Sequence, residues 1–323
     1  MSTGKHHKLT AAVIGLGNIG MQYDNELSPN HILTHCNAFA KHEGYSLLGA
    51  VEPCPDIRKI FETKYQLPAF ETIDKMLEHH QPKVVAFCVP YQLQAKMVLE
   101  LINHYRPKAV LLEKPVAATL QEAENLAKTL DNQGILACVN YIRRFEPGVL
   151  KMRDYILSGK IGKVKSVVGW YFKSLKSNGC HIIDLMNFIF SSHIKTTPTI
   201  QLSCDNEEHV LLNYGEIPVH LFLCPNQFVR FELEFIGEQG AIAYLNNGRE
   251  IIYKNVCQDE VFKHIHTLQE SEIIANDLYR YQWHVQDALY QAILGRNTLN
   301  STLNTALLTE ALIDRATVKE TEV

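Results

Sequence analysis

The chain has no long apolar run and no large excess of one charge, and each absence argues against a class of protein. Its longest apolar segments fall well short of the roughly 18 residues that a membrane-spanning helix needs, and the N-terminal MSTGKHHK has no apolar secretory stretch. The 31 basic and 35 acidic residues give a net charge of −4, without a long like-charge block. We therefore expect a cytoplasmic protein whose partners are neither nucleic acids nor membranes.

The cysteines form no CxxC pair, and several lie inside apolar runs. This pattern favours buried free thiols in a reducing compartment over a disulfide framework or a zinc site. The eight cysteines are Cys36, Cys54, Cys88, Cys138, Cys180, Cys204, Cys224 and Cys257. No metal site is predicted.

A length of 323 residues exceeds the usual size of one hydrophobic core, so two domains are expected. Over residues 1–121, short apolar runs alternate with helix-length segments, which predicts a doubly wound parallel sheet in an α/β domain. In residues 122–323, long β-type runs follow Lys163 and predict an α+β domain with a large, open, mostly antiparallel sheet. Two C-terminal helices, near 276–294 and 304–318, could pack back on the first domain.

The second sheet is expected to pack one face on helices at residues 147–158 and 180–191. The runs HLFLC and FELEFIG suggest that its other face is apolar as well. Because an exposed apolar face needs a partner, we expect a homodimer or homotetramer formed through this sheet.

A glycine-rich turn follows the first predicted strand, in LTAAVIGLGNIG. Gly15 would permit the tight turn, Gly17 would let the backbone approach a pyrophosphate, and Gly20 would let the next helix pack closely. Asn18 and Ile19 lie between them and would contact the same ligand. The strand context favours a dinucleotide site, and the alternative is a structural glycine turn.

Glu52 ends the second predicted strand, YSLLGAVEP, where a carboxylate would accept hydrogen bonds from the adenine ribose. Its spacing from the glycines is longer than usual, which we attribute to an insertion over residues 21–32. A carboxylate there would repel a 2′-phosphate, so NAD is favoured over NADP, although Arg58 leaves NADP possible. The alternative for Glu52 is a solvated strand end. Asp56 is expected to cap the following helix.

Lys114 stands at the end of the fifth predicted strand, in LLEKP. Ligands of open α/β sheets bind at the carboxyl ends of the strands, so Lys114 is placed to donate a hydrogen bond or a proton to a reacting oxygen. The alternative is a solvated lysine on an exposed turn.

His181 and Asp184 lie three residues apart in SNGCHIIDLMNFI. On a helix they would share one face, where the carboxylate could hold the imidazole in one tautomer as a general acid or base. The alternative is a core histidine bonded within its own helix.

Together these motifs resemble the glucose-fructose oxidoreductase and inositol dehydrogenase family (Gfo/Idh/MocA). The resemblance is carried by GLGNIG, the acidic end of strand two, EKP, YIRRFEP, SGKIGKV and GCHIID, and it covers essentially the whole chain. It implies an N-terminal Rossmann domain and a C-terminal α/β domain whose open sheet often forms oligomers. It also implies hydride transfer between NAD(P) and a hydroxyl carbon of a sugar, sugar nucleotide or cyclitol.

The resemblance assigns roles to individual residues. Lys114 matches the catalytic lysine that binds the reacting oxygen, and His181 matches the catalytic histidine. The residues that it places around the cofactor are Pro90, Tyr91, Glu113, Lys114, Arg143 and Arg144. The residues that we expect near the substrate are Lys114, Tyr141, Ser177, Asn178 and His181.

One position departs from the family pattern. Four residues before the histidine the family usually has an aspartate, and this chain has Ser177. A hydroxyl cannot replace the charge of a carboxylate in a proton relay, so Asp184 is a candidate to share that role.

We therefore predict an NAD-dependent oxidoreductase in which Lys114 and His181 handle the hydroxyl proton. Two alternatives stay open. One is a non-catalytic NAD-binding regulator or sensor on the same scaffold. The other is an enzyme that recycles tightly bound NAD during epimerisation, elimination or glycoside cleavage.

Overall fold

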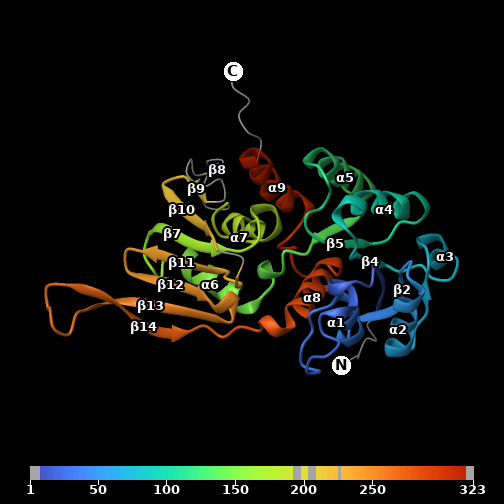
Figure 1. Ribbon diagram of the computed structural model, residues 1–323, viewed down its shortest axis with the longest axis horizontal. Helices are drawn as coiled ribbons and strands as arrows, with labels where there is room; N and C mark the ends of the chain where they lie inside the picture. The colour runs from blue at the N-terminus through green and yellow to red at the C-terminus, as the bar shows by residue number, and fades with distance from the viewer. Residues whose placement is uncertain (1–7, 192–197, 203–208, 225–226, 318–323) are drawn as a thin grey trace, which may run out of the picture. The chain divides into compact units, whose positions relative to one another are not determined.

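The computed structural model describes residues 8–191, 198–202, 209–224 and 227–317 (Figure 1). The chain forms two compact units. The first contains the described residues up to Phe145 together with Tyr279–Leu307, and the second contains Glu146–Leu278 together with the described residues from Leu308 onward. The boundary predicted at residues 121 and 122 falls inside the first unit.

The first unit is built on a six-stranded parallel sheet with the order β3-β2-β1-β4-β5-β6. Its strands are β1 (Leu9–Ile14), β2 (Tyr45–Val51), β3 (Ala69–Phe70), β4 (Val84–Phe87), β5 (Ala109–Leu112) and β6 (Leu136–Val139). Every residue of β4 and β5 is buried, as expected for strands that are covered on both faces. The predicted doubly wound sheet is confirmed, and it extends through β6.

The helices of this unit begin and end largely at residues with clear local signals. They are α1 (His35–Lys41), α2 (Pro55–Tyr65), α3 (Ile73–Leu77), α4 (Tyr91–His104), α5 (Leu120–Gln133) and α8 (Tyr281–Ile293). A capping box formed by Thr119 and Glu122 starts α5, and Gly134 ends it in the left-handed conformation. The prediction for α2 was wrong, because Cys54 is the N-cap and Pro55 opens the helix, which leaves Asp56 in the first turn.

Helix α8 belongs to the first unit although it lies far along the chain. Its residues Val285, Leu289 and Tyr290 are part of the same buried cluster as strands β1, β2, β4 and β5. The core of the first unit is therefore completed by a segment near the C-terminus.

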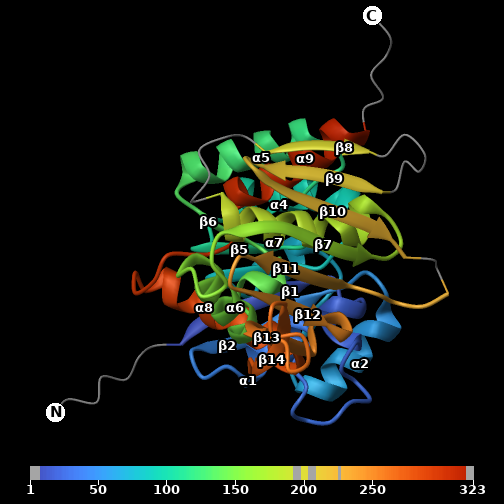
Figure 2. The ribbon, with the colours of Figure 1, turned by 90° about the vertical axis from the view of Figure 1, so that its left-hand side faces the viewer.

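The second unit is built on an eight-stranded sheet with the order β14-β13-β12-β11-β7-β10-β9-β8, seen strand by strand in Figure 2. Its strands are β7 (Val164–Tyr171), β8 (Thr199–Leu202), β9 (Val210–Tyr214), β10 (Ile217–Leu223), β11 (Glu232–Gly237), β12 (Gly240–Leu245), β13 (Glu250–Gln258) and β14 (His266–Ile273). Among the strand pairs of the described residues, only β7–β10 is parallel, so the prediction of a mostly antiparallel sheet is confirmed. Strand β14 was not expected from the sequence.

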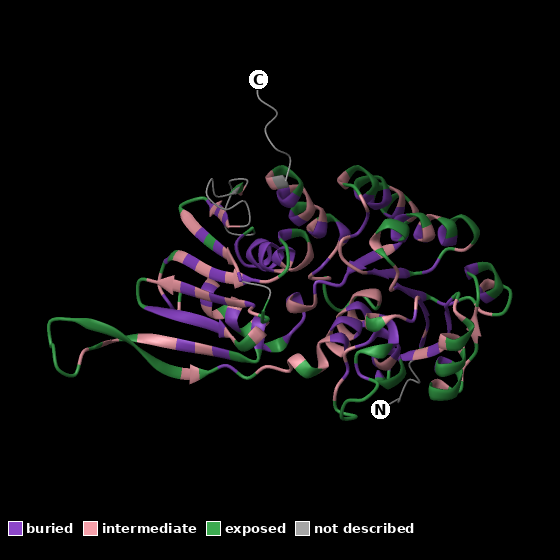
Figure 3. Ribbon diagram, in the orientation of Figure 1, coloured by how far each residue is buried: buried purple, intermediate pink, exposed green. Residues whose placement is uncertain are grey.

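Helices α6 (Pro147–Leu157) and α7 (Cys180–Phe190) cover one face of this sheet, as predicted. The Phe190 ring of α7 lies 5.5 Å from the ring of Tyr214 and 6.3 Å from that of Phe235. The Tyr155 ring of α6 lies 5.9 Å from that of Tyr253. Helix α7 is buried almost throughout, as Figure 3 shows, and only His181 interrupts its run of buried residues.

The opposite face of the sheet carries partly exposed large side chains. The rings of Trp170 and Phe222 lie 6.2 Å apart there, and the guanidinium of Arg230 lies 3.9 Å from the Trp170 ring centre. Strands β13 and β14 extend as a long hairpin beyond the other strands of this sheet (Figure 1).

The described cysteines are all free thiols, four of them buried, and Cys204 lies outside the described residues.

Within the described ranges, no helix is both long and apolar enough to cross a membrane. Across those same ranges, no cluster of three or more potential metal ligands occurs. The α9 helix (Leu303–Thr317) closes the described chain.

Candidate functional site

The glycine turn after β1 has the geometry of a dinucleotide-binding turn. Gly15 has φ +93°, and a Cβ atom there would lie 2.4 Å from the carbonyl oxygen of Cys88. A Cβ atom on Gly20 would lie 2.2 Å from the carbonyl oxygen of Gly15. A Cβ atom on Gly17 would meet no described atom within 4 Å. The fold therefore requires the first and third glycines, whereas the second leaves open space where a ligand can approach the backbone.

Glu52 is tied to this turn rather than solvated. Its side-chain oxygens accept hydrogen bonds from the backbone N–H groups of Leu16 and Cys54, both at 3.0 Å, and the residue is 8% exposed. The Arg58 guanidinium donates to the carbonyl oxygens of Glu52 and Pro53, each at 2.7 Å. A carboxylate and a cation thus stand together at the carboxyl end of β2.

A cavity of about 210 Å³ adjoins this strand end. It is bordered by Gly15 after β1, by Val51 and Pro53 at the end of β2, by Val89 after β4 and by Thr72 before α3. These are the carboxyl ends of parallel strands, where doubly wound sheets bind nucleotides. The residues present therefore fit the adenosine half of a dinucleotide.

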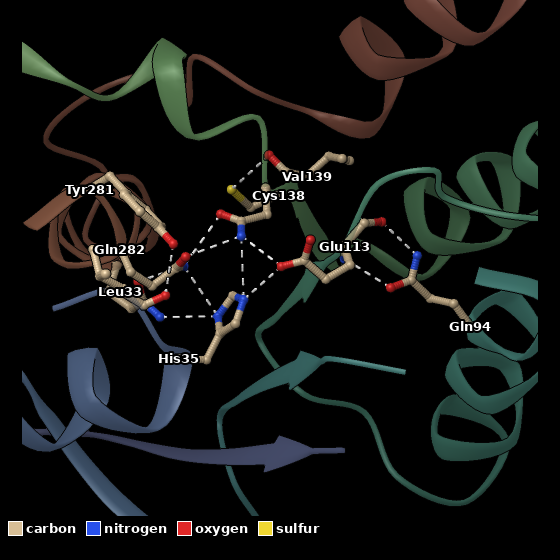
Figure 4. Close-up of polar contacts among 10 residues, drawn as sticks. Leu33, His35, Gln94, Glu113, Cys138, Val139, Tyr281 and Gln282 are labelled. Atoms are coloured by element: carbon tan, nitrogen blue, oxygen red, sulfur yellow. Dashed lines mark hydrogen bonds and ion pairs between the residues drawn. The ribbon is translucent and has the colours of Figure 1, made fainter. Parts of the chain in front are cut away.

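The Lys114 turn follows β5, and a buried glutamine of α4 holds its backbone. The Gln94 side chain accepts from the Glu113 N–H at 2.8 Å and donates to the Glu113 carbonyl oxygen at 2.7 Å (Figure 4). It also donates to the carbonyl oxygen of Val116 at 2.9 Å. Lys114 is partly exposed, and the Lys114–Pro115 peptide bond is cis. The lysine therefore sits on a turn whose path is fixed by hydrogen bonds on either side of it.

The Glu113 side chain joins a polar network inside the first unit. One carboxylate oxygen accepts from His35 Nε2 at 2.9 Å and from Asn140 Nδ2 at 2.6 Å (Figure 4). Gln282 and Gln286 of α8 contact the other ring nitrogen of His35. His35, Gln94, Asn140, Gln282 and Gln286 were not predicted from the sequence. The only sequence signal of each is a polar residue in an otherwise apolar segment.

The predicted site residues in the segment after β6 differ in their burial. Tyr141 and Arg144 are buried, whereas Arg143 is partly exposed. The Arg144 guanidinium donates to the carbonyl oxygen of Asn300 at 2.9 Å, and the Asn300 amide donates back to the Arg144 carbonyl at 3.2 Å. Arg144 therefore ties this turn to the chain before α9. At the start of α4, Pro90 is exposed and Tyr91 is partly exposed.

In the second unit, the segment before α7 forms a π-helical turn over Leu175–Gly179, and Ser174 caps it. The N–H of Ser177 donates to Ser174 Oγ at 3.2 Å, and the Ser177 hydroxyl accepts from Asn178 Nδ2 at 3.1 Å. His181 is partly exposed in the first turn of α7, and its ring lies 6.5 Å from that of Phe231.

Asp184 is 1% exposed and takes part in a network of buried hydrogen bonds. It accepts from Thr309 Oγ1 at 3.3 Å, and Thr309 accepts from Asn187 Nδ2 at 3.0 Å. The Tyr214 hydroxyl donates to Asn187 Oδ1 at 2.8 Å. Asp184 therefore helps to fix α7 against the sheet and α9.

The predicted residues divide between the two units. Gly15, Gly17, Gly20 and Glu52 gather at the carboxyl ends of β1 and β2, and Lys114 follows β5 of the same sheet. His181, Asp184, Ser177 and Asn178 belong to the second unit. The prediction that Lys114 and His181 act on one oxygen stays a prediction.

Comparison with known proteins agrees with the parallel sheet and the glycine turn. Residues 9–141 match the model of the oxidoreductase family with an NAD-binding Rossmann fold, Gfo/Idh/MocA.

The curated relatives include two inositol dehydrogenases from Bacillus subtilis. The scyllo-inositol 2-dehydrogenase (NADP(+)) IolW is 25% identical over 218 residues, which cover 55% of this chain and 60% of that protein. The scyllo-inositol 2-dehydrogenase (NAD(+)) is 24% identical over 157 residues, which cover 49% of this chain and 42% of that protein. The chain thus matches about half of the length of these relatives.

Among solved structures, the super-repressor mutant of Gal80p from Saccharomyces cerevisiae has a TM-score of 0.77 and 12% identity. The match covers 96% of this chain and 95% of that one, so the likeness in fold extends over both units.

Proposed function

Because residues 9–141 match the model of the Gfo/Idh/MocA oxidoreductase family, we propose that the chain is an NAD(P)-dependent oxidoreductase acting on a secondary alcohol. The proposed substrates are sugars, sugar nucleotides and cyclitols. The observation that carries the proposal is the Lys114 turn, which follows a strand of the same sheet as the glycine turn and is held there by Gln94. The names of the inositol dehydrogenase relatives support the substrate class.

In the proposed mechanism, the bound cofactor supplies the hydride acceptor at its nicotinamide ring. The Lys114 ammonium polarises the reacting oxygen, and His181 accepts the hydroxyl proton in the oxidative direction. Asp184 is a positioning residue, because its hydrogen bond from Thr309 helps to fix the helix that carries His181. In reduction, His181 returns the proton.

The cofactor preference that we propose is NAD. The Glu52 carboxylate at the end of β2 would repel a 2′-phosphate, whereas the neighbouring Arg58 guanidinium would attract it. The two inositol dehydrogenases named above carry NAD(+) and NADP(+) in their names. Fluorescence titration with NADH and NADPH tests the preference, and tighter binding of NADPH would overturn it.

Substitution of the two proposed catalytic residues tests the reaction. Lys114→Ala and His181→Ala should each lower kcat by about 10² to 10⁴, because a positioned acid or base typically contributes that much. The dissociation constant of NADH, measured by fluorescence, should change little. Normal turnover by both variants would show that the roles are wrong.

A second candidate is a non-catalytic NAD-binding regulator, favoured by Ser177 at the position where the family pattern has aspartate. The fold-level likeness to a Gal80p super-repressor mutant is compatible with it. The regulator hypothesis predicts NAD binding without any product from a polyol panel. Product analysis by mass spectrometry also tests a third hypothesis, in which the enzyme recycles tightly bound NAD and forms product without net NADH.

We further propose that the chain forms a homodimer or homotetramer through the face of the second sheet that carries Trp170 and Phe222. These partly exposed rings face away from α6 and α7, and burying them against a second copy would remove apolar area from water. Light scattering coupled to gel filtration tests this proposal, and a monomer at micromolar concentration would refute it.

A further inference from the structure

His35 is a buried histidine that no part of the proposed mechanism uses. It lies at the start of α1 with 0% exposure, and it contacts three segments that are distant in the sequence. These are the Lys114 turn through Glu113, the end of β6 through Asn140, and α8 through two glutamines (Figure 4). A fully buried imidazole with polar partners on both ring nitrogens has a defined orientation.

The partners of His35 determine which nitrogen carries the proton. Its Nδ1 lies 3.2 Å from the amide nitrogen of Gln282 and 3.2 Å from that of Gln286. Both amide nitrogens are donors, so Nδ1 is the acceptor. The proton is therefore on Nε2, which donates to the Glu113 carboxylate at 2.9 Å. Asn140 Nδ2 also lies 3.4 Å from Nε2, but its two hydrogens have nearer acceptors in Glu113 at 2.6 Å and Gln282 at 3.1 Å.

The orientations of the side-chain amides agree with this arrangement. Asn140 Nδ2 donates to Gln282 Oε1 at 3.1 Å, and Gln282 Nε2 donates to Asn140 Oδ1 at 3.3 Å. Asn140 Nδ2 also lies 2.6 Å from the Glu113 oxygen that His35 contacts. Two N–H donors thus converge on one carboxylate oxygen, which fixes the direction of the Glu113 side chain.

Glu113 immediately precedes Lys114, so whatever fixes Glu113 also restricts the lysine. Gln94 holds the backbone of residue 113 from α4, and His35 holds its side chain from α1. We propose that His35 is a positioning residue, which orients Lys114 for reaction by anchoring Glu113. This inference rests on the proposed oxidoreductase function. Small displacements of a catalytic group can cost about 10²-fold in rate, so the expected effect is on turnover.

The same helix region offers a matched control. His42, the residue after α1, is 6% exposed and also links this region to α8. Its Nδ1 accepts from the Gly44 N–H at 3.0 Å, and its Nε2 lies 3.2 Å from Asp287 Oδ1. His42 therefore shares the burial and the α8 contact of His35, but its bonds run to Gly44 and Asp287 rather than to Glu113.

The experiment compares His35→Leu, His35→Gln and His42→Leu in the full chain. We expect His35→Leu to lower kcat by about 10- to 100-fold while the dissociation constant of NADH changes less than about twofold. Because the glutamine amide can replace Nε2–H as a donor, His35→Gln should recover most of the turnover. His42→Leu should lower the melting temperature as His35→Leu does, without the loss of kcat.

Two further measurements do not depend on turnover. The rate at which trinitrobenzenesulfonate labels Lys114, read by mass spectrometry, should change in His35→Leu and not in His42→Leu. In the wild-type protein, ¹⁵N shifts of His35 should report a neutral ring with its proton on Nε2, so the inference can be tested even where His35→Leu does not fold.

The outcomes separate this inference from the proposed function. Wild-type-like kcat in His35→Leu, an equal loss of kcat in His42→Leu, or a proton on Nδ1 would each overturn the role of His35. If the wild type converts no polyol while labelling of Lys114 still depends on His35, the proposed function fails and the anchoring of Lys114 stands.

Discussion

The second and third glycines of the turn after β1 should respond oppositely to the same substitution. In Gly20→Ala, the new methyl group would lie 2.2 Å from the carbonyl oxygen of Gly15, which is backbone and cannot rotate away. Overpacking of this kind typically costs about 1–3 kcal/mol, and a backbone contact this short places the effect at the upper end. Gly20→Ala should therefore lower the stability of the first unit by about 3 kcal/mol.

Gly17→Ala should leave the fold intact or stabilise it slightly. Gly17 has φ −69° and ψ −159°, an extended conformation that alanine adopts, and its new methyl group would meet no described atom within 4 Å. Restricting the unfolded chain should then add about 0.4–1 kcal/mol of stability. The same methyl group would occupy the space through which a pyrophosphate approaches the backbone, so NADH affinity should fall at least about tenfold, or about 1.4 kcal/mol.

Thermal unfolding and fluorescence titration with NADH measure the two effects separately. We expect Gly17→Ala to be stable and to bind NADH poorly, and we expect Gly20→Ala to be unstable. It would be refuted if Gly17→Ala lost as much stability as Gly20→Ala, or if Gly17→Ala bound NADH with wild-type affinity.

Two further predictions concern the second unit. Thr309→Val removes the hydroxyl that donates to buried Asp184, and it should cost about 1–3 kcal/mol in urea denaturation, whereas Thr309→Ser should retain most of the stability. At the hairpin tip, the backbone N–H groups of Phe262 and Val261 lower the pKa of Asp259. Because this pKa is lowered by folding, the ionised Asp259 carboxylate stabilises the turn fully above the usual aspartate pKa of about 4. The stabilisation is lost as the pH falls through the lower pKa that Asp259 has in the folded protein. The protection factors of the amides of residues 261 and 262, each taken against the intrinsic exchange rate at the same pH, should then fall at acidic pH in the wild type, and Asp259→Asn should remove that pH dependence.

The parts of the fold that depend on local signals could be predicted from the sequence. The apolar runs of β4 and β5 specify buried parallel strands, and Thr119, Glu122 and Gly134 specify the two ends of α5. The start of α2 was misplaced because Pro55, rather than Asp56, opens the helix. Strand β14 was missed because HTLQESEI is almost entirely exposed, and it therefore lacks the apolar alternation that marks a half-buried strand.

The environment of the candidate site could be predicted only in part. The glycine turn and Glu52 lie close together as expected, since both belong to the first βαβ unit. His35 and Glu113 are 78 residues apart, and His35 and Gln282 are 247 apart. A buried hydrogen-bond network of this kind depends on the tertiary fold, and a single sequence shows no periodicity that would reveal it.

Because α8 belongs to the first unit, this unit cannot complete its folding early in translation. While the ribosome is still producing the second sheet, the nascent Rossmann sheet lacks Val285, Leu289 and Tyr290, and the Nδ1 of His35 lacks its two glutamine donors. Domains usually fold in order from the N-terminus during synthesis. Here the N-terminal unit can reach its final packing only after translation has passed residue 293, so early termination should leave it incompletely folded and accessible to proteases.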